Sequence, residues 1–575
     1  MAGDVPETQP DFRATIPGML HAVAARYAEY PAVCKDAITI SYRGLEAQSA
    51  ELARGLLALG VGKGDRVGIL LPNGPEFVVI FLAATRIGAV AAPLSTLYQG
   101  AELRWVLEHA AIRWLVTAGV FRSHDYLARL ESALPGLAGQ DAEAGALAVS
   151  GAPFLRGVFV PGETDRRWAR SLFDAAAAAL AARPQFDAEF LSAVEAQIAP
   201  ADPVCIIHTS GSTAHPKGVI HGHGPFIRHT YQMAKDFTPL GPGDRVVALR
   251  PFFWVAGLAA QLFYCLQAGA CHITIDSPSE EALLRAIREQ GMNMIAGDES
   301  WYQNLRRSAG LRDAGFEMVE LSVEFGGVAQ QDADGRLQFL SPNLAARLPR
   351  PEHFDIERFP WTFGMTEFLG AHTSLPFGEH TPADRPRVGG RPVPGVRARI
   401  CDPETHVTLP PGTPGELEVR GYSMMLGMDG RERGELFTDD GYYRTDDLAT
   451  MDADGYVTLI GRLGDGFKVK GANVAPLEVE LALYGFSQIE RCCVLGIPLD
   501  KSRTDHLVVA VVQPSAGSTI DEAAILAGLK ANLSSYKVPH HIMVFAPEDI
   551  PITGSGKVKR SKLQELVAER LALHG

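Results

Sequence analysis

Strand-like and helix-like stretches alternate along the first hundred residues of the chain. Residues 38–42 have the β-branched and aromatic side chains of a strand, and a helical repeat of leucines follows until Gly60. A second strand is predicted at 67–71, a helix at 76–87 and a third strand at 89–93. Strands that alternate with helices predict an α/β fold with a parallel, doubly wound sheet.

The most informative polar stretch follows an apolar run at residues 204–207, which is typical of a buried strand. Residues 209–218 then read TSGSTAHPKG, which is not a Walker A motif. Gly211 lets the backbone approach a ligand closely, and the hydroxyls together with the Lys217 ammonium suit a polyphosphate. A solvated loop is the alternative, because short clusters of Ser, Thr and Gly are usually loops. The side chains expected at the phosphates are Thr209, Ser210, Ser212, Thr213 and Lys217.

Composition, charge and cysteine usage narrow the class of protein. A chain of 575 residues that is 46% hydrophobic can bury more than one core. Its net charge of −14 argues against binding to nucleic acids or membrane surfaces. Seven cysteines without a C-x-x-C pair indicate reduced thiols, which favours the cytoplasm. Residues 1–11 are unlike a signal peptide, and the apolar run 77–94, interrupted by Arg86, predicts a core helix rather than a membrane span.

The loop at 209–218 resembles the signature of the adenylate-forming superfamily, which comprises acyl-CoA synthetases, luciferases and the adenylation domains of peptide synthetases. Ala214 stands where the usual loop has a second glycine. Later segments resemble the other family motifs in the same order, at 251–257, 325–328, 363–367, 443–447, 461–471 and 551–560. The resemblance covers nearly the whole chain and is closest to the AMP-forming acyl-CoA synthetases.

The resemblance implies a two-domain α/β architecture. Residues 1–460 are expected to form a large adenylation domain of parallel and mixed sheets wrapped by helices, together with a β-barrel-like subdomain. Residues 461–575 are expected to form a small, mobile α+β domain that carries a catalytic lysine.

The resemblance also implies a nucleotide site. An aromatic residue, Phe363, is expected to stack on adenine, and Thr366 is expected to contact phosphate. Glu367 is expected to hold Mg²⁺, a cation that prefers carboxylate and phosphate oxygens. The residues expected along the adenine are Gly327, Val328, Phe363 and Gly364.

Residues near the expected domain boundary complete the expected nucleotide site and supply the hinge. Asp447 is expected to accept hydrogen bonds from the ribose hydroxyls, and Asp446 replaces the glycine that usually precedes it. Arg462 matches the family arginine. Gly464 occupies the hinge position, where relatives carry Asp or Lys, and glycine tolerates large changes of φ and ψ.

Three residues of the small domain are expected to act in different half-reactions. Lys557 takes the place of the catalytic lysine of adenylation. Lys468 and Gly471 are expected to reach the site in the orientation that forms the thioester, with Gly471 giving a pantetheine arm close access to the backbone.

The segment 251–257 is expected to line the acyl pocket. A plain aromatic core patch is the alternative, which we favour for Phe252 but not for Trp254. No acidic residue is placed there to bind an amino group, so the acid is expected to be aliphatic, aromatic or polycyclic rather than an amino acid. The expected pocket residues are Trp254, Val255, Gly257 and Met365.

Together these residues predict an ATP-dependent carboxylate–CoA ligase that forms an acyl-AMP and then a thioester. ATP, CoA and Mg²⁺ are the implied cofactors, nucleic acid and stable membrane insertion are not expected, and a homodimer is compatible with the prediction. Two alternatives stay open. One is an acyl-AMP ligase that loads a carrier protein, and the other is a nucleotide- or acyl-binding pseudoenzyme, suggested by the departures at Ala214, Asp446 and Gly464.

Overall fold

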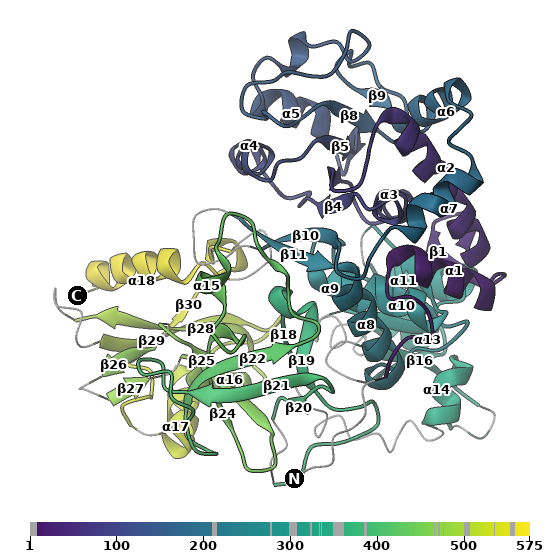
Figure 1. Ribbon diagram of the computed structural model, residues 1–575. Helices are drawn as coiled ribbons and strands as arrows, with labels where there is room; N and C mark the ends of the chain where they lie inside the picture. The colour runs from purple at the N-terminus through teal and green to yellow at the C-terminus, as the bar shows by residue number, and fades with distance from the viewer. Residues whose placement is uncertain are drawn as a thin grey trace. The chain divides into compact units, whose positions relative to one another are not determined.

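A computed structural model describes most of the chain, which divides into two compact units (Figure 1). Unit 1 comprises residues 1–397 and 420–437, and unit 2 comprises residues 398–419 and 438–575. The domain boundary expected at 460/461 falls within unit 2 and stays a prediction. The described residues are 8–574 without 210–215, 277–278, 298–307, 322–324, 333, 335, 349–361, 385–387, 465, 470–471, 475, 500–505, 534 and 553–557.

Two mixed sheets of eight strands form the framework of unit 1. The first has the order β15-β16-β14-β12-β13-β1-β2, with β17 paired to β16, and the second has the order β23-β11-β10-β4-β3-β5-β8-β9. The run from β10 to β9 in the second sheet is parallel, whereas β11 and β23 are antiparallel. The strands of the first sheet are β1 (Pro31–Lys35), β2 (Ile38–Ser41), β12 (Arg245–Ala248), β13 (Cys271–Thr274), β14 (Met294–Ala296), β15 (Phe316–Glu320), β16 (Phe325–Gln331) and β17 (Leu337–Phe339). Those of the second are β3 (Arg66–Leu70), β4 (Val90–Pro93), β5 (Trp114–Thr117), β8 (Gly157–Val160), β9 (Arg170–Ser171), β10 (Pro203–Thr209), β11 (Lys217–Gly222) and β23 (Gly427–Met428).

The predicted α/β alternation is confirmed in the second sheet, with one correction. Strands β3 and β4 and the helix between them lie within one residue of their predicted bounds and are parallel neighbours. Strand β2, in contrast, pairs antiparallel with β1 in the first sheet. The reason is a tight turn at residues 36–37, where Asp36 has a φ of 50°, which reverses the chain before the first crossover helix begins.

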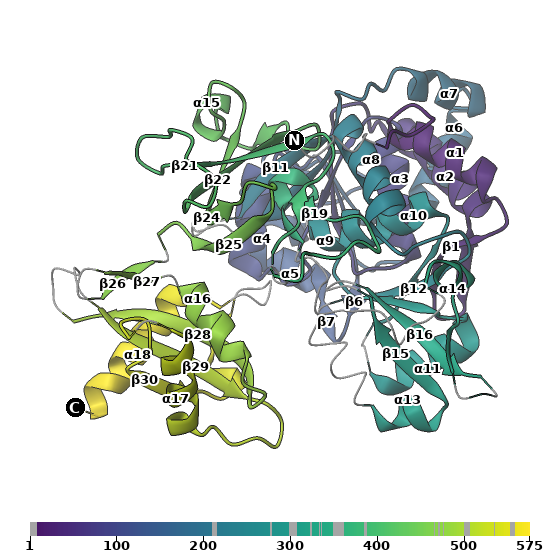
Figure 2. The same ribbon diagram turned by 90° about the horizontal axis from the view of Figure 1, so that it is seen from below.

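Helices α1, α3, α8 and α10 pack together in unit 1 (Figure 2). Helix α3 is buried along its whole length except Glu76, and its single basic residue, Arg86, is only 1% exposed. The Arg86 guanidinium is neutralised inside the core, because Nε lies 2.5 Å from Glu195 Oε1 and Nη1 donates to Ser49 Oγ at 2.9 Å. The apolar run at 77–94 therefore contributes a core helix and a core strand, as predicted. The larger helices of unit 1 are α1 (Ile16–Arg26), α2 (Tyr42–Leu59), α3 (Pro75–Arg86), α4 (Gly100–His109), α5 (Tyr126–Ala133), α6 (Leu172–Ala182), α7 (Ala188–Ala196), α8 (His223–Gln232), α10 (Tyr264–Ala268), α11 (Glu280–Gln290), α13 (Ala309–Asp313) and α14 (Pro342–Arg347).

Among the described residues, no helix combines the length and the apolar character that a membrane crossing needs.

Two small antiparallel sheets follow along the chain. Strands β18 (Phe363–Met365), β19 (Gly370–Ser374) and β20 (Arg391–Pro392) form one of them in unit 1. A second, of four strands, has the order β21-β22-β24-β25, and the expected β-barrel-like subdomain stays a prediction. Its strands are β21 (Val396–Cys401), β22 (Gly415–Gly421), β24 (Tyr443–Met451) and β25 (Val457–Arg462).

The end of the chain forms a three-stranded sheet with helices on both faces, as expected for an α+β domain. Along its central strand, β29, Val508, Ala510 and Val512 join the core that contains α16 and α17, whereas Val509 and Val511 face α18. Figure 1 shows α17 and α18 on opposite sides of the sheet. The elements here are β26 (Phe467–Val469), β27 (Ala472–Val474), α16 (Pro476–Tyr484), β28 (Ile489–Pro498), β29 (His506–Pro514), α17 (Glu522–Asn532), β30 (His541–Val544) and α18 (Arg560–His574).

Candidate active site

The expected phosphate loop connects two paired strands. β10 and β11 are antiparallel, and Thr209 at the end of β10 is the direct partner of Lys217 at the start of β11. Both side chains are half-buried. The residues expected to cradle phosphate, Ser210, Gly211, Ser212 and Thr213, lie outside the described residues, as does Ala214. The strand predicted before the loop is confirmed, and the hairpin places Lys217 at the far end of the loop.

An ion pair from distant parts of the sequence supports the base of this hairpin. Arg66 on β3 binds Asp429 with two parallel hydrogen bonds of 2.8 and 2.9 Å. The Asp429 amide in turn donates to the carbonyl of Gly218 at 2.9 Å. A Cβ atom at Gly218 would lie 2.9 Å from Asp429 Oδ2, so this position is restricted to glycine. Arg66 and Asp429 are positioning residues that the sequence motifs do not reveal.

Residues 425–429, which we call the clamp, join the hairpin to the Thr366–Glu367 turn. Within the clamp, the Met425 amide donates to the carbonyl of Glu367 at 2.8 Å, and the Leu426 amide donates to the carbonyl of Ile220 at 2.8 Å. Strand β23 of the clamp also pairs with β11. The structure therefore holds the strand that begins with Lys217 and the turn that carries Glu367 in one hydrogen-bonded assembly.

The turn itself links β18 to β19 through a short 3₁₀ segment, η6 (Thr366–Phe368). Thr366 and Glu367 are half-buried. The buried Leu369 has a φ of 62°, which closes the turn in the left-handed region and is strained for a side chain of this size. Thr366 and Glu367 thus occupy a tight, stabilised reversal between two strands.

Glycines fix the aromatic residue of this motif. A Cβ at Gly364 would lie 2.3 Å from the carbonyl oxygen of Gly370, and a Cβ at Gly389 would lie 2.0 Å from the Phe363 ring. Phe363 is half-buried, and its ring lies against the Gly389 backbone. Gly389 is a further contributor that sequence reasoning missed, although the Gly389-Gly390 pair is a visible signal of a close approach.

The two residues expected along adenine, Gly327 and Val328, belong to β16 in the interior of the first sheet. A Cβ at Gly327 would meet Leu344 at 2.7 Å and Phe339 at 2.8 Å, so packing alone accounts for this glycine. The Val328 side chain is fully buried in an apolar cluster. A contact between Val328 and adenine therefore has to come from its backbone.

The segment expected to line the acyl pocket begins helix α9 (Val255–Gly257), with Trp254 at its N-cap. Trp254 and Val255 are half-buried, and Trp254 packs edge-to-face on Phe253. Phe252, in contrast, is fully buried against Phe77, which confirms it as a core residue. The segment is tied to the turn before α3, because Asn73 bonds the carbonyl of residue 250 at 2.9 Å and the amide of Phe252 at 2.8 Å.

Gly257 and Met365 are the remaining residues expected in the acyl pocket. A Cβ at Gly257 would lie 2.0 Å from the Pro251 carbonyl oxygen, so the tight turn requires glycine there. Met365, the other expected pocket residue, is half-buried on β18. The roles of these residues toward an acyl chain stay predictions.

In unit 2 the expected ribose residue and the family arginine are direct neighbours. Asp447 on β24 and Arg462 on β25 are cross-strand partners, and Arg462 Nη1 lies 2.9 Å from Asp447 Oδ1. Asp446, which replaces the usual glycine, has a φ of 59°, in the left-handed region that glycine adopts readily. Its carbonyl accepts from the Leu463 amide at 2.7 Å, directly before Gly464.

Gly464 itself has a φ of 89°, and an added Cβ would meet no atom of the described residues within 4 Å. Glycine is therefore required by backbone conformation and not by packing. Lys468 lies on β26, with a side chain outside the described set, and Gly471 lies outside the described residues. Lys557 also lies outside the described residues. It belongs to the segment between Ile552 and Val558, which pair in an isolated antiparallel bridge.

Three buried histidines surround the clamped assembly of unit 1. Burial lowers the pKa of His221 on β11 to about 3, of His229 on α8 to about 3, and of His372 on β19 to about 4. These rings are therefore neutral at physiological pH and add no positive charge beside the Thr366–Glu367 turn. The backbone segments that the clamp joins carry the Lys217 ammonium and the Glu367 carboxylate, and groups of these kinds suit a phosphate ester with a hard divalent cation.

Comparisons with known proteins agree with this arrangement. The acyl-CoA ligase SID4 of Ajellomyces capsulatus is 29% identical to this chain, over 97% of this chain and 92% of that protein. The mitochondrial medium-chain acyl-CoA ligase ACSF2 of Macaca fascicularis is 27% identical, over 97% and 88%. The crystal structure of ATP-bound MatB from Rhodopseudomonas palustris superposes with a TM-score of 0.70 at 25% identity, over 96% of this chain and 99% of that one.

The sequence profile of the AMP-binding enzymes matches residues 20–428, which is most of the chain. The profile of the AMP-binding enzyme C-terminal domain matches residues 478–557. Thus the hairpin at Lys217, residues 425–428 of the clamp and the Thr366–Glu367 turn fall within the first match, and this chain belongs to the AMP-binding enzyme family.

Proposed function

We propose that this protein, an AMP-forming carboxylate–CoA ligase, activates a hydrophobic carboxylic acid as its acyl-adenylate and then transfers the acyl group to CoA. The observation that carries the proposal is the clamp, which ties the strand beginning with Lys217 to the Glu367 turn. The names of the full-length relatives support CoA as the acceptor and do not favour a carrier protein or a pseudoenzyme.

The chemistry explains why cationic groups are needed. A carboxylate resists nucleophilic attack because it is anionic and has a poor leaving group. Its oxygen attacks the α-phosphorus of ATP, the bond to pyrophosphate breaks, and the resulting acyl-AMP contains a good leaving group. Charge develops on the phosphate oxygens during this displacement, and the preorganised cations Lys217 and Lys557 stabilise it.

The donor set around the Thr366–Glu367 turn suits magnesium and a triphosphate. Glu367 offers a hard carboxylate oxygen and Thr366 a hydroxyl, and both side chains are half-buried rather than sealed in the core. Glu367 would hold Mg²⁺, which would neutralise charge on the phosphate oxygens. The ATP present in the similar MatB structure supports ATP as the nucleotide. Asp447 and Arg462 contribute the ribose contacts in this proposal, and Phe363 the adenine contact.

The thioester step requires a second arrangement, in which Lys557 withdraws and Lys468 and Gly471 approach. The CoA thiol then attacks the acyl carbonyl, and AMP leaves with its bonding electrons. Gly464 is the pivot in this proposal, since its φ of 89° is accessible to glycine at little cost. Cytoplasmic location and a homodimer stay predictions.

A two-stage assay tests the proposed function. Exchange of labelled pyrophosphate into ATP, measured over a panel of aliphatic, aromatic and polycyclic acids, reports adenylation alone. AMP release that depends on CoA then reports the thioester step. Exchange without CoA-dependent release would identify an acyl-AMP ligase, and no exchange with any acid would identify a binding protein.

Trp254→Ala is expected to change the ranking of accepted acids by about tenfold while leaving the KM for ATP nearly unchanged. The reason is that a half-buried wall residue contributes to binding of the acyl group and not of the nucleotide. Pyrophosphate exchange across the acid panel measures both quantities. Phe252→Ala is the matched core control, because Phe252 is fully buried and its loss should lower stability by about 3–5 kcal/mol. An unchanged acid ranking in Trp254→Ala would assign Trp254 to the core as well.

Gly464→Pro is expected to affect the two half-reactions unequally. Proline fixes φ near −65°, so it excludes the observed value of 89°, and a pivot restricted in this way cannot serve both orientations. Single-turnover measurement of adenylation and of thioester formation checks this. Gly517→Pro is a matched control, because Gly517 in unit 2 also has a positive φ, 75°, and open space around it. Equal rates of both steps in Gly464→Pro and wild type would remove Gly464 as the pivot.

A further inference from the structure

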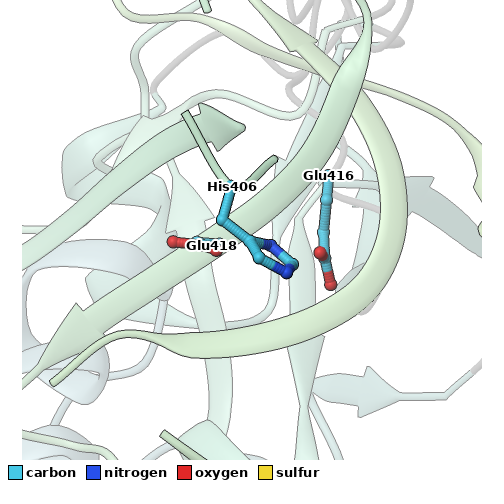
Figure 3. A group of neighbouring side chains, drawn as sticks. All are labelled: His406, Glu416 and Glu418. Carbon is cyan, nitrogen blue, oxygen red and sulfur yellow. The ribbon is translucent and has the colours of Figure 1, made fainter. Parts of the chain in front are cut away.

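Three side chains in unit 2 converge at a position that the proposed reaction does not use. His406, Glu416 and Glu418 each offer one ligand atom, and these atoms lie within 4.8 Å of one another. Figure 3 shows the imidazole of His406 between the two carboxylates. Glu416 and Glu418 are two residues apart on β22, so they project from the same face of the strand. His406 reaches them from the loop between β21 and β22.

Both carboxylates are buried, which is unusual for two neighbouring acids. Glu416 is 4% exposed and Glu418 is 0% exposed. Among the described residues, Glu418 Oε1 has no hydrogen-bond partner, and Arg444 Nε lies 3.7 Å away, beyond hydrogen-bonding distance. A buried carboxylate oxygen without a donor is costly, so this atom calls for a further cationic partner.

The remaining oxygens are held by outer partners, as in sites where carboxylates bind a metal. Glu418 Oε2 accepts from Arg399 Nε at 2.7 Å, and Arg399 is itself paired with Asp440 at 2.6 Å. Glu416 Oε1 accepts from the amide of Asp446 at 3.3 Å. Each carboxylate thus has one oxygen oriented by a protein donor and a second one that can turn toward an ion.

The position of His406 is also fixed by its surroundings. Its φ of 57° and the hydrogen bond from its amide to the carbonyl of Asp402, 2.8 Å, set the loop. The Asp402 carboxylate accepts from the amides of Glu404 and Thr405, which closes the same turn. The imidazole is therefore presented toward β22 by a structured loop.

We propose that His406, Glu416 and Glu418 form a binding site for a divalent transition metal ion, with Zn²⁺ as the best fit. One imidazole and two carboxylates are the kinds of ligand that Zn²⁺ accepts, and three protein ligands leave a fourth position for water. Mg²⁺ fits less well, because it prefers oxygen ligands alone. Zinc–ligand distances of about 2.0–2.2 Å require the side chains to close by roughly 1 Å, which small rotations supply. The Arg444 side chain, 45% exposed, can move into solvent as the ion binds.

The site adjoins the turn that carries the expected ribose residue. Glu416 supports the Asp446 amide, and the ladder between β22 and β24 shifts register between Glu416 and Glu418 to accommodate residues 445–447. A metal bound to Glu416 therefore braces the turn that positions Asp447. The metal site does not depend on the proposed reaction, since its ligands belong to unit 2 and Glu367 to unit 1.

Calorimetric titration of ZnCl₂ into the full-length protein, after dialysis against EDTA, tests the site. Wild type is expected to bind one Zn²⁺ that millimolar Mg²⁺ does not displace. His406→Asn removes the imidazole while tolerating the left-handed backbone, and should weaken this binding by more than about tenfold. His541→Asn, an exposed histidine of the same unit, is the matched control and should bind as wild type does.

A spectroscopic measurement with a second variant tests the metal site even if His406→Asn does not fold. Co²⁺ added to wild type is expected to give visible absorption bands that Zn²⁺ abolishes, and Glu416→Gln should lose them while keeping an acceptor for the Asp446 amide. The proposal is overturned if wild type shows no saturable Zn²⁺ binding, or if His406→Asn and Glu416→Gln both bind Zn²⁺ as tightly as wild type.

Discussion

Lys557→Ala is expected to slow formation of the acyl-adenylate by about a hundredfold or more, while thioester formation from supplied acyl-adenylate stays close to wild type. Removal of one preorganised cation from a displacement at phosphorus costs a few kcal/mol of transition-state stabilisation. In the proposed mechanism the second step displaces AMP from a carbonyl after Lys557 has withdrawn, so it should not use this charge. Pyrophosphate exchange measures the first step, and a single turnover started from synthetic acyl-AMP and CoA measures the second.

Lys559→Ala provides the matched control for this experiment. Lys559 is exposed two residues further on, and its amide bonds the carbonyl of Pro551 at 2.8 Å, so its backbone belongs to the same loop base. Its loss should leave both steps unchanged. Lys557→Arg should retain part of the adenylation rate, because arginine keeps the positive charge but carries it on a planar guanidinium instead of an ammonium. Equal losses in both half-reactions of Lys557→Ala would assign Lys557 a structural role.

The periodic pattern of the sequence was sufficient to predict local elements and their parallel pairing. β3, α3 and β4 follow their predicted bounds closely because their apolar patterns are clear and Gly74-Pro75 marks the start of α3. The membership of β2 in the other sheet was not predictable, since a two-residue turn and not the periodicity decides it. Strand propensity identifies a strand without naming its partner.

In the candidate site, too, residues in contiguous motifs could be predicted from the sequence, whereas contacts between distant segments could not. Lys217, Thr366 and Glu367 were found because their motifs are contiguous in the sequence. Asp429 and Arg66 are 363 residues apart, and only the folded chain brings them under the hairpin. Asp446 shows the converse case. As a departure from the family glycine it suggested impairment, yet its φ of 59° lies in the left-handed region, which glycine adopts readily and aspartate tolerates better than most residues.

Unit 1 is expected to lose stability steeply as the pH falls from 6.5 toward 4. Burial lowers the pKa of six of its histidines from the ordinary 6.5 to about 3 or 4, and these are His208, His221, His223, His229, His272 and His372. Between those values the unfolded chain binds protons that the folded chain excludes. The stabilising effect is therefore complete above pH 6.5 and is lost as the pH falls toward the folded-state values.

The size of the effect follows from the number of protons. Each histidine lowers the free energy of unfolding by up to about 1.4 kcal/mol per pH unit, so six lower it by up to about 8 kcal/mol per unit. Domains are stable by about 5–15 kcal/mol, so one to two pH units below 6 should suffice to unfold unit 1. All six tryptophans of the chain lie before residue 398, so their fluorescence during urea unfolding reports on unit 1 alone.

Single variants show whether the histidines cause this loss. His229→Gln keeps a polar side chain but cannot be protonated, so the number of protons taken up on unfolding between pH 6 and 5 should fall by about one. His541→Gln, exposed and in unit 2, should leave that number unchanged. A free energy of unfolding for unit 1 that stays constant from pH 7 to pH 5 would mean that the folded protein takes up these protons as readily as the unfolded chain does, and would contradict the lowered histidine pKa values. The histidines beside the Thr366–Glu367 turn would then become cationic as the pH falls toward 5.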